Sequence, residues 1–234
     1  MSVFKIADIA VEIEPKNDEV KRILAPFSSE CESVAAIEVT DLDIVYEKGF
    51  AESVSDFASE ATAILRKMCD LLLYRFDGMF LHSATVVYNG GAYAFSAPSG
   101  TGKTTHILKW KRLLGDKVRI LNGDKLFLRY IDDEIVAYGN PWQGKENLGE
   151  NDKCLLKGIF VIKRDENNFV RRLSATDALM SLVDSTVFPK DSEGRIKVLE
   201  FFDKLISAVP VFELHCNLDD EAVYTAISAT EGNI

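Results

Sequence analysis

Nine consecutive residues in the middle of this chain have the types and spacing that bind the phosphates of a nucleotide. They span 97–105 and read Ala-Pro-Ser-Gly-Thr-Gly-Lys-Thr-Thr. Four residues separate Ala97 from the Gly102-Lys103-Thr104 triplet, which is the spacing of a Walker A phosphate loop. Glycines let the backbone curl so that its N–H groups point at an anion. The strict motif begins with glycine, and here that place is Ala97.

The side chains of this segment have predicted tasks. Lys103 can reach the β- and γ-phosphates, and the Thr104 hydroxyl can ligate Mg²⁺. A helix after the loop would add the positive end of its dipole. The predicted ligand is therefore a nucleotide with its metal ion. The predicted phosphate-binding residues are Ser99, Gly100, Thr101, Gly102, Lys103, Thr104 and Thr105.

A phosphoryl-transfer site also needs an acid that holds the metal or orients the nucleophile. Asp124 lies 21 residues after Lys103, at the carboxyl end of a strand predicted over 118–121. That end of a strand faces the same crevice as a phosphate loop. We predict that Asp124 serves as metal ligand and as base. The alternative is a turn aspartate, since Asn-Gly-Asp is also good turn sequence.

Local elements must position the loop, and the sequence predicts them on both sides. Residues 92–96 read as a short buried strand, and 106–114 have apolar residues at helical spacing that end at Gly115. Strand, glycine-rich loop and helix is the context that the motif requires. The alternative is an ordinary Gly/Ser-rich turn between a strand and a helix.

The remaining pattern mixes hairpins and helices, which argues against a simple doubly wound sheet. A polar loop with a helical turn is expected over 15–33, and Asp219 is expected to cap the last helix. Asp132 and Asp133 are expected to form a hairpin turn. Predicted helices span 57–74, 174–183, 195–208 and 219–227. Predicted strands span 4–14, 36–39, 44–46, 80–88, 126–130, 135–138, 158–162 and 211–214.

Composition sets limits on the class of protein. With 234 residues, 47% of them hydrophobic, the chain can form one large domain, spanning 1–234. Its net charge of −10 argues against nucleic acid as the main partner. The four cysteines are far apart, which favours reduced thiols and a cytoplasmic location. The N-terminus lacks the build of a signal peptide, and no apolar run is long enough to cross a membrane.

An ordered series of motifs resembles one family. Leu81-His82-Ser83-Ala84 precedes a hairpin, and SAPSGTGKTTH and ILNGDKLFLR follow. This order is similar to the catalytic domain of HPr kinase/phosphorylase, and more closely to HPr-kinase-related proteins found beside peptide-maturation genes. AYGNPWQGKENLGENDKCLLKGIFVIKRD, RLSATDAL and VPVFELHCNLDDEAV extend the resemblance. It covers 78–230, the expected kinase core, and leaves 1–50 as a β-rich N-terminal subregion.

The resemblance implies a fold and an activity. The implied fold is α/β and like phosphoenolpyruvate carboxykinase: a curved mixed sheet flanked by helices, with the phosphate loop at one edge. The implied activity is an ATP- and Mg²⁺-dependent kinase that acts on a Ser, Thr or other hydroxyl of a peptide, protein or small molecule. Because relatives form oligomers, a homo-oligomer is one expected state.

The resemblance also implies roles for single residues. His82 matches a family histidine near the phosphates, although a strand histidine is as often satisfied in the core. The family usually has two successive acids where this chain has Gly123 and Asp124, so only the second is kept. In the loop at 144–147, Lys145 is expected to stabilise charge in the transition state. Trp142 could stack on a base or be buried.

Two other functions stay open at this point. The first is a nucleotide-binding accessory protein of a peptide-maturation system that transfers no phosphate, and the missing first acid favours it. The second is a carboxykinase-like reaction on a small acid. It would need a metal site with His and Lys ligands, and three scattered histidines do not assemble one. Arg171 and Arg172 could bind a phosphate or form a solvated pair on a strand end.

Overall fold

A large mixed sheet forms the centre of the molecule in the computed structural model, which describes residues 2–49 and 55–231. Within those residues the sheet is eight-stranded, with order β10-β11-β9-β5-β4-β7-β8, and β6 pairs with β4 beside this path. Its strands are β4 (Gly78–Tyr88), β5 (Gly91–Ser96), β6 (Val118–Asn122), β7 (Lys125–Ile131), β8 (Glu134–Tyr138), β9 (Lys153–Arg164), β10 (Phe169–Arg172) and β11 (Val211–Cys216). The expected α/β class with a curved mixed sheet is confirmed.

The curvature of the sheet comes from one long strand. The first residues of β9 pair with β8, and its later residues pair with β5. Because β5, β4, β7 and β8 are also paired in that order, the pairings close into a ring. Parallel pairs join β5 to β9 and β9 to β11, so the carboxyl ends of these three strands meet at one edge.

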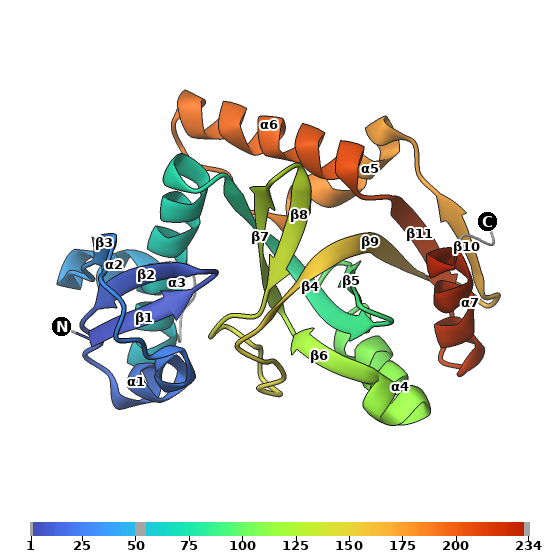
Figure 1. Ribbon diagram of the computed structural model, residues 1–234, viewed down its shortest axis with the longest axis horizontal. Coiled ribbons are helices and arrows are strands. Elements are labelled where there is room, and N and C mark those ends of the chain that lie inside the picture. The colour runs from blue at the N-terminus through green and yellow to red at the C-terminus, as the bar shows by residue number, and fades with distance from the viewer. Residues whose placement is uncertain (1, 50–54, 232–234) are drawn as a thin grey trace.

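Helices cover this sheet on several sides (Figure 1). They are α3 (Asp56–Arg75), α4 (Lys103–Leu114), α5 (Ala175–Leu182), α6 (Ser192–Ala208) and α7 (Glu221–Thr230). Helix α6 lies across the top in that view, with α5 beside it, and α4 lies below β6. Short 3₁₀ helices lie at Ala25–Phe27, Gly115–Lys117 and Val183–Ser185.

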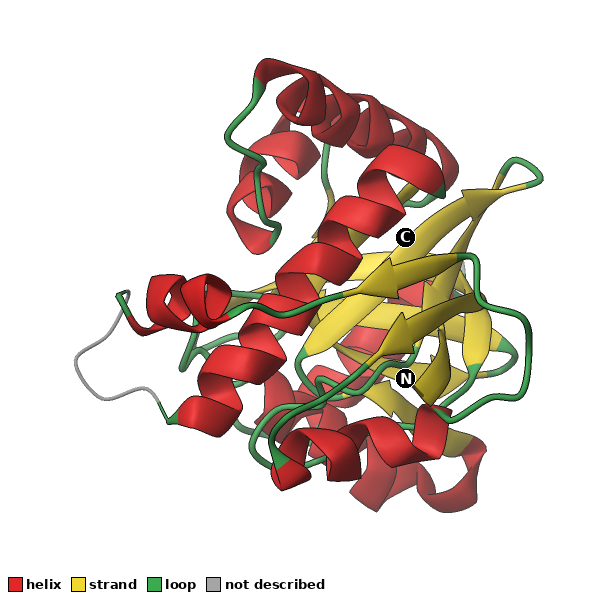
Figure 2. Ribbon diagram, turned by 90° about the vertical axis from the view of Figure 1, so that its left-hand side faces the viewer, coloured by secondary structure: helices red, strands yellow, loops and turns green. Residues whose placement is uncertain are grey.

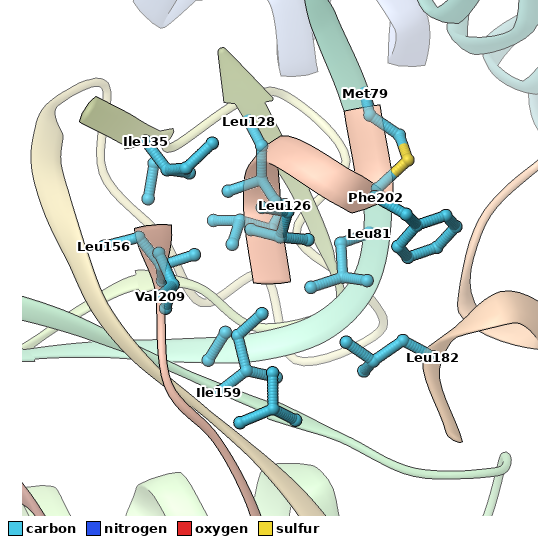
Figure 3. Packing of buried hydrophobic residues seen from close by; sticks show 14 of the residues in the cluster. Met79, Leu81, Leu126, Leu128, Ile135, Leu156, Ile159, Leu182, Phe202 and Val209 are labelled. Atoms are coloured by element: carbon cyan, nitrogen blue, oxygen red, sulfur yellow. The ribbon is translucent and has the colours of Figure 1, made fainter. Parts of the chain in front are cut away.

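The ring of strands encloses an apolar core. Met79 and Leu81 of β4 and Leu126 and Leu128 of β7 point inward together, and Phe202 of α6 packs beside them (Figure 3). Side chains alternate along a strand, so the residues between them face the other way. Phe80 and Phe127 accordingly belong to a second core on the opposite face. By the same alternation, His82 of β4 lies on that opposite face with Phe80.

The N-terminal part forms a small sheet of its own. Strands β1 (Ser2–Ile6) and β2 (Ile9–Ile13) make a hairpin, and β3 (Ala35–Ile37) pairs parallel to β2. Helices α1 (Asp18–Leu24) and α2 (Asp41–Lys48) accompany it. Figure 2 looks onto this side, where α3 crosses the molecule diagonally. The expected 1–50 subregion is described only for 2–49, and residues 1, 50 and 234 of the expected boundaries lie outside the described residues.

Two local predictions are wrong, and a third is confirmed with a longer helix than expected. Residues 44–46 belong to α2 and not to a strand, because Thr40 and Asp43 form a capping box that begins a helix. The helical turn expected within 15–33 is present as the two-turn helix α1, whose N-cap Asn17 accepts a hydrogen bond from the Glu19 N–H. The N-cap of α7 is Asp220 and not Asp219, and it makes no capping hydrogen bond.

Candidate active site

The phosphate loop connects β5 to α4. Its Gly100 and Gly102 have φ angles of 77° and 123°, in the region that side chains other than glycine rarely adopt. These angles explain the spacing of the motif, because the chain must turn sharply twice before α4 begins at Lys103. The loop leaves β5 in the middle of the strand order. Because the loop follows the carboxyl end of β5, it lies at the edge where the carboxyl ends of β5, β9 and β11 meet.

One cavity of about 870 Å³ lies in front of this loop. It brings together nearly all of the residues singled out from the sequence, although they come from β4, the loop, α4 and two later loops. Thr101 is the exception, since it faces a neighbouring cavity. The predicted residues that line the cavity are Ser99, Gly100, Gly102, Lys103, Thr104, Thr105, His82, Asp124 and Lys145.

Lys103 is buried within the loop. Its Nζ donates a hydrogen bond to the Ala97 carbonyl at 2.8 Å, and its side chain is among the buried charged groups. Burial lowers the pKa of the Lys103 ammonium, while the charge of Asp124 opposes this effect. Nζ also lies 3.5 Å from the Pro98 carbonyl oxygen, so the loop itself holds the ammonium at the cavity wall, and at least one of its three donors remains for a phosphate oxygen.

Asp124 is an ionised carboxylate at the far side of the cavity. Its Oδ1 lies 3.1 Å from Nε2 of His82, and its Oδ2 pairs with Lys125. The hydrogen bond from His82, followed by that from Lys125, holds the pKa of this carboxyl well below its usual range. Asp124 therefore keeps its negative charge at neutral pH. His82 is a site residue and not a core histidine, since 35% of its side chain is exposed.

The turn that carries Asp124 is built by Asn122. The Oδ1 atom of this buried asparagine accepts hydrogen bonds from the backbone N–H groups of Asp124 and Lys125, at 2.9 and 2.8 Å. Its Nδ2 donates to Asn140. Residues 122–124 thus form a turn that also places Asp124 at the cavity. The interpretations of Asp124 as a turn residue and as the acid of the site are therefore compatible.

Gly123 has no room for a side chain. Its N–H donates to the Leu148 carbonyl at 2.7 Å, and a Cβ atom here would lie 2.9 Å from the carbonyl oxygen of Gln143. The absence of an acid at this position therefore allows the loop of residues 143–148 to pack against the end of β6. The same packing places Lys145 and Glu146 over the cavity.

Glu146 is a cavity residue that the sequence reasoning did not single out as an acid. A Cβ at Gly144 would lie 2.9 Å from Cβ of Asp124 and 3.8 Å from Oε2 of Glu146. The side chains of Asp124 and Glu146 therefore both lie beside the backbone of Gly144. The only sequence signal was the position of Glu146 beside Lys145 in a loop already expected to face the site.

Other candidates lie away from the cavity. Trp142 is buried, and its indole N–H donates to the Ala61 carbonyl of α3 at 2.8 Å, so it cannot stack on a base. Arg171 forms an ion pair with Glu213 on β11. Asp132 and Asp133 form the β7–β8 turn, as expected, with φ angles of 50° and 63°.

A second cavity, of about 480 Å³, adjoins the first on the other side of the loop. Both cavities touch Gly100, Gly102 and Thr105. The additional walls of the second cavity come from α4 and from the carboxyl ends of β9 and β11. These walls contain Thr101, His106, Lys109, Ile162, Arg164, Asp165, Cys216, Asn217 and Leu218.

The metal and membrane expectations can be compared with the described residues alone. In 2–49 and 55–231, no group of three or more His, Cys, Asp or Glu side chains is placed to hold a metal ion. No helix in those ranges is long and apolar enough to cross a membrane. Cys31, Cys69, Cys154 and Cys216 are free thiols.

Comparison with known proteins finds a distant likeness. No protein-family profile matches the chain, and no curated protein matches its sequence. Among solved structures, the chain is similar to the HPr(Ser) kinase/phosphatase from Coxiella burnetii, with a TM-score of 0.35 and 10% sequence identity. That match covers 66% of this chain and 93% of the other. The residues of the cavity, and not a relative, therefore carry the functional conclusion.

Proposed function

We propose that the protein is an ATP- and Mg²⁺-dependent phosphotransferase that moves the γ-phosphate to a hydroxyl of a peptide, protein or small molecule. The observation that carries this proposal is that Lys103, Thr104 and Asp124 line one cavity. A phosphate loop, a metal-binding hydroxyl and an acid are the parts that phosphoryl transfer requires.

The residues present fit a magnesium–nucleotide complex. The positive φ angles of Gly100 and Gly102 turn the loop backbone as an anion cradle requires. Mg²⁺ usually binds to one or two carboxylates together with substrate phosphates and water, and Asp124 and the Thr104 hydroxyl are oxygen ligands of the right kind. When bound, the ion would neutralise charge on the β- and γ-phosphates.

The chain's own groups would supply positioning and charge. Loop N–H groups hold the β-phosphate, and Lys103 binds the γ-phosphate, with Lys145 beside the same cavity. The acceptor oxygen forms a bond to the γ-phosphorus, while the bond to the β–γ bridging oxygen breaks and ADP leaves with that electron pair. The hydroxyl proton passes to Asp124. A weak base suffices, because little covalent chemistry falls to the protein in a loose transition state.

Binding and transfer can be tested separately. Lys103→Ala should weaken Mg·ATP binding at least tenfold and remove the thermal shift that Mg·ATP produces. Lys157→Ala is the matched control, since Lys157 lies on β9 and its Nζ is 3.9 Å from Glu134. Unchanged ATP affinity in Lys103→Ala would show that the site is misassigned.

A second candidate function is a nucleotide-binding accessory protein without phosphotransfer. The observation that favours it is that both oxygens of Asp124 already contact cationic or donor side chains, His82 and Lys125. A screen for ³²P transfer from labelled ATP to peptides and small hydroxyl compounds separates the two candidates. Transfer that Asp124→Asn reduces at least a hundredfold supports the phosphotransferase, and ATP binding with no transfer to any acceptor supports the accessory protein.

A further inference from the structure

We propose that the second cavity binds the nucleoside of the donor nucleotide and holds the base mainly by apolar contact. This inference rests on the proposed function, because it assumes that the first cavity receives the phosphates. Its subject is the space between the phosphate loop and the carboxyl ends of β9 and β11.

The position of the cavity suits a ligand that spans the loop. Since β5, β9 and β11 are parallel neighbours, their carboxyl ends meet at one edge, where open α/β sheets bind ligands. Gly100, Gly102 and Thr105 line both cavities. A molecule with its phosphates on one side of these residues can therefore extend into the space on the other side. Asp124 and Lys145 line only the first cavity, so the two ends of the ligand meet different chemistry.

The dimensions and the apolar walls suit a nucleoside. A volume of about 480 Å³ lies in the range of small-molecule pockets. Ile162 and Cys216 form buried apolar surface. Leu218 lies at the cavity with 79% of its surface exposed, so a ligand in the cavity would contact it.

Four polar side chains of this cavity already have partners within the protein. Arg164 donates to the carbonyls of Gly100 and Thr101 in the phosphate loop. The carboxylate of Asp165 accepts from Nδ1 of His215 at 2.9 Å and from the Asn167 N–H at 3.0 Å.

Two of these side chains, Asn217 and Lys109, form hydrogen bonds near Leu218. The side-chain oxygen of Asn217 accepts from Asn168 and from the Asp219 N–H, and its Nδ2 donates to the Glu166 carbonyl. Lys109 donates to the Leu218 carbonyl.

These bonds occupy groups that would otherwise read the edge of a base. Strong discrimination between similar ligands arises where a site hydrogen-bonds the distinguishing group, whereas an apolar pocket discriminates weakly. The structure therefore predicts that ATP and GTP bind with affinities within about tenfold of each other. Because the base is held by contact with its flat faces and not by hydrogen bonds to its edges, Leu218 contributes more to nucleotide affinity than the polar residues around it.

Calorimetric titration of the full chain with Mg·ATP, Mg·GTP and Mg·tripolyphosphate tests the assignment. Leu218→Ala should weaken both nucleotides about fivefold and leave tripolyphosphate within twofold of the unsubstituted protein. Leu108→Ala is the matched control, because Leu108 is an exposed leucine of α4 that lines neither cavity. As a second readout, hydrogen exchange of the amides of residues 217–219 should slow with Mg·ATP and not with Mg·tripolyphosphate.

The outcomes separate this inference from the function on which it rests. If Leu218→Ala leaves ATP affinity unchanged, or weakens tripolyphosphate as much as ATP, the nucleoside lies elsewhere and the phosphate site stands. A preference for ATP or GTP above a hundredfold overturns recognition by apolar contact. If the unsubstituted protein binds neither ATP nor tripolyphosphate, the proposed function fails and this inference fails with it.

Discussion

Oδ1 of Asp124 lies 3.1 Å from Nε2 of His82, although 41 residues stand between them in the chain. The pairing of β4 with β7 produces this contact, because His82 is the register partner of Lys125, the residue after Asp124. Both side chains line the cavity in front of the loop. The strand register therefore places a hydrogen-bond donor on the acid that the sequence had assigned to catalysis.

The first prediction concerns the pH dependence of Mg·ATP binding in His82→Ala. The hydrogen bond from His82 is the largest cause of the lowered pKa of Asp124. A hydrogen-bond donor stabilises the charged carboxylate and lowers its pKa, so the group stays charged in acid. Removing the donor raises the pKa of Asp124, and its charge is then lost at a higher pH. Binding measured as the pH is lowered into the acid range should decline at a higher pH in His82→Ala. His82→Gln keeps a donor and should resemble the unsubstituted protein, and identical profiles for all three would contradict the assigned coupling.

The second prediction concerns Gly123, where a restored acid should not rescue activity. A Cβ at this position meets the carbonyl oxygens of Gln143 and Leu148 at 2.9 and 3.1 Å. Gly123→Ala and Gly123→Asp should each lower the free energy of unfolding by about 1–3 kcal/mol, since overpacking displaces the backbone of the loop. Denaturant unfolding measures the loss. Gly123→Asp with unchanged stability and faster phosphate transfer would show that the loop does not depend on glycine.

The third prediction concerns Glu146, whose side chain, like that of Asp124, lies beside Gly144. Two carboxylates at one metal–nucleotide site share the work of holding Mg²⁺ and orienting the acceptor. Glu146→Gln should raise the Mg²⁺ concentration needed for half-maximal ATP binding, or slow transfer, by about tenfold. Glu150→Gln is the control in the same loop, because Glu150 pairs with Arg119 and lines neither cavity. Equal effects of the two substitutions would indicate a general loss of negative charge.

The sequence predicted those parts of the site that depend on neighbours in the chain. The strand that ends at Ser96, the helix that begins at Lys103 and the turn at Asp124 follow from local spacing, and the structure contains all of them. The hairpin turn at Asp132 and Asp133 was local in the same way.

Features that depend on distant contacts were not predicted. The parallel pairing of β5 with β9 closes the ring through two strands that are separated in the chain by α4, β6, β7 and β8, and no local pattern indicates it. Trp142 is buried because the Ala61 carbonyl of α3 accepts its indole N–H, a contact across 81 residues. The position of Glu146 at the cavity depends on the hydrogen bond from the Gly123 N–H to the Leu148 carbonyl. Residues 44–46 show the opposite failure, since a local capping box outweighed β-forming side chains.

The last prediction concerns stability in mild acid. His106 is buried in α4, where its Nε2 accepts the indole N–H of Trp110 at 3.0 Å and its ring lies 4.6 Å from that of Phe95. Burial, with a smaller effect of Lys109, lowers the pKa of His106 from 6.5 to about 3. The unfolded chain therefore binds about one more proton than the folded protein between these two values, and folding should weaken as the pH falls below 6.5. The slope approaches about 1.4 kcal/mol per pH unit.

Urea unfolding of the unsubstituted protein and of His106→Gln between pH 7.5 and 5 isolates this contribution. Glutamine can still accept from Trp110 but does not titrate, so the variant should lose less stability per pH unit although it starts from a lower value. Carboxylates with lowered pKa values also lose stability in acid, but they do so nearer pH 4 and equally in both proteins. Parallel pH dependences in the two proteins over this window would mean that His106 is not held neutral in the fold.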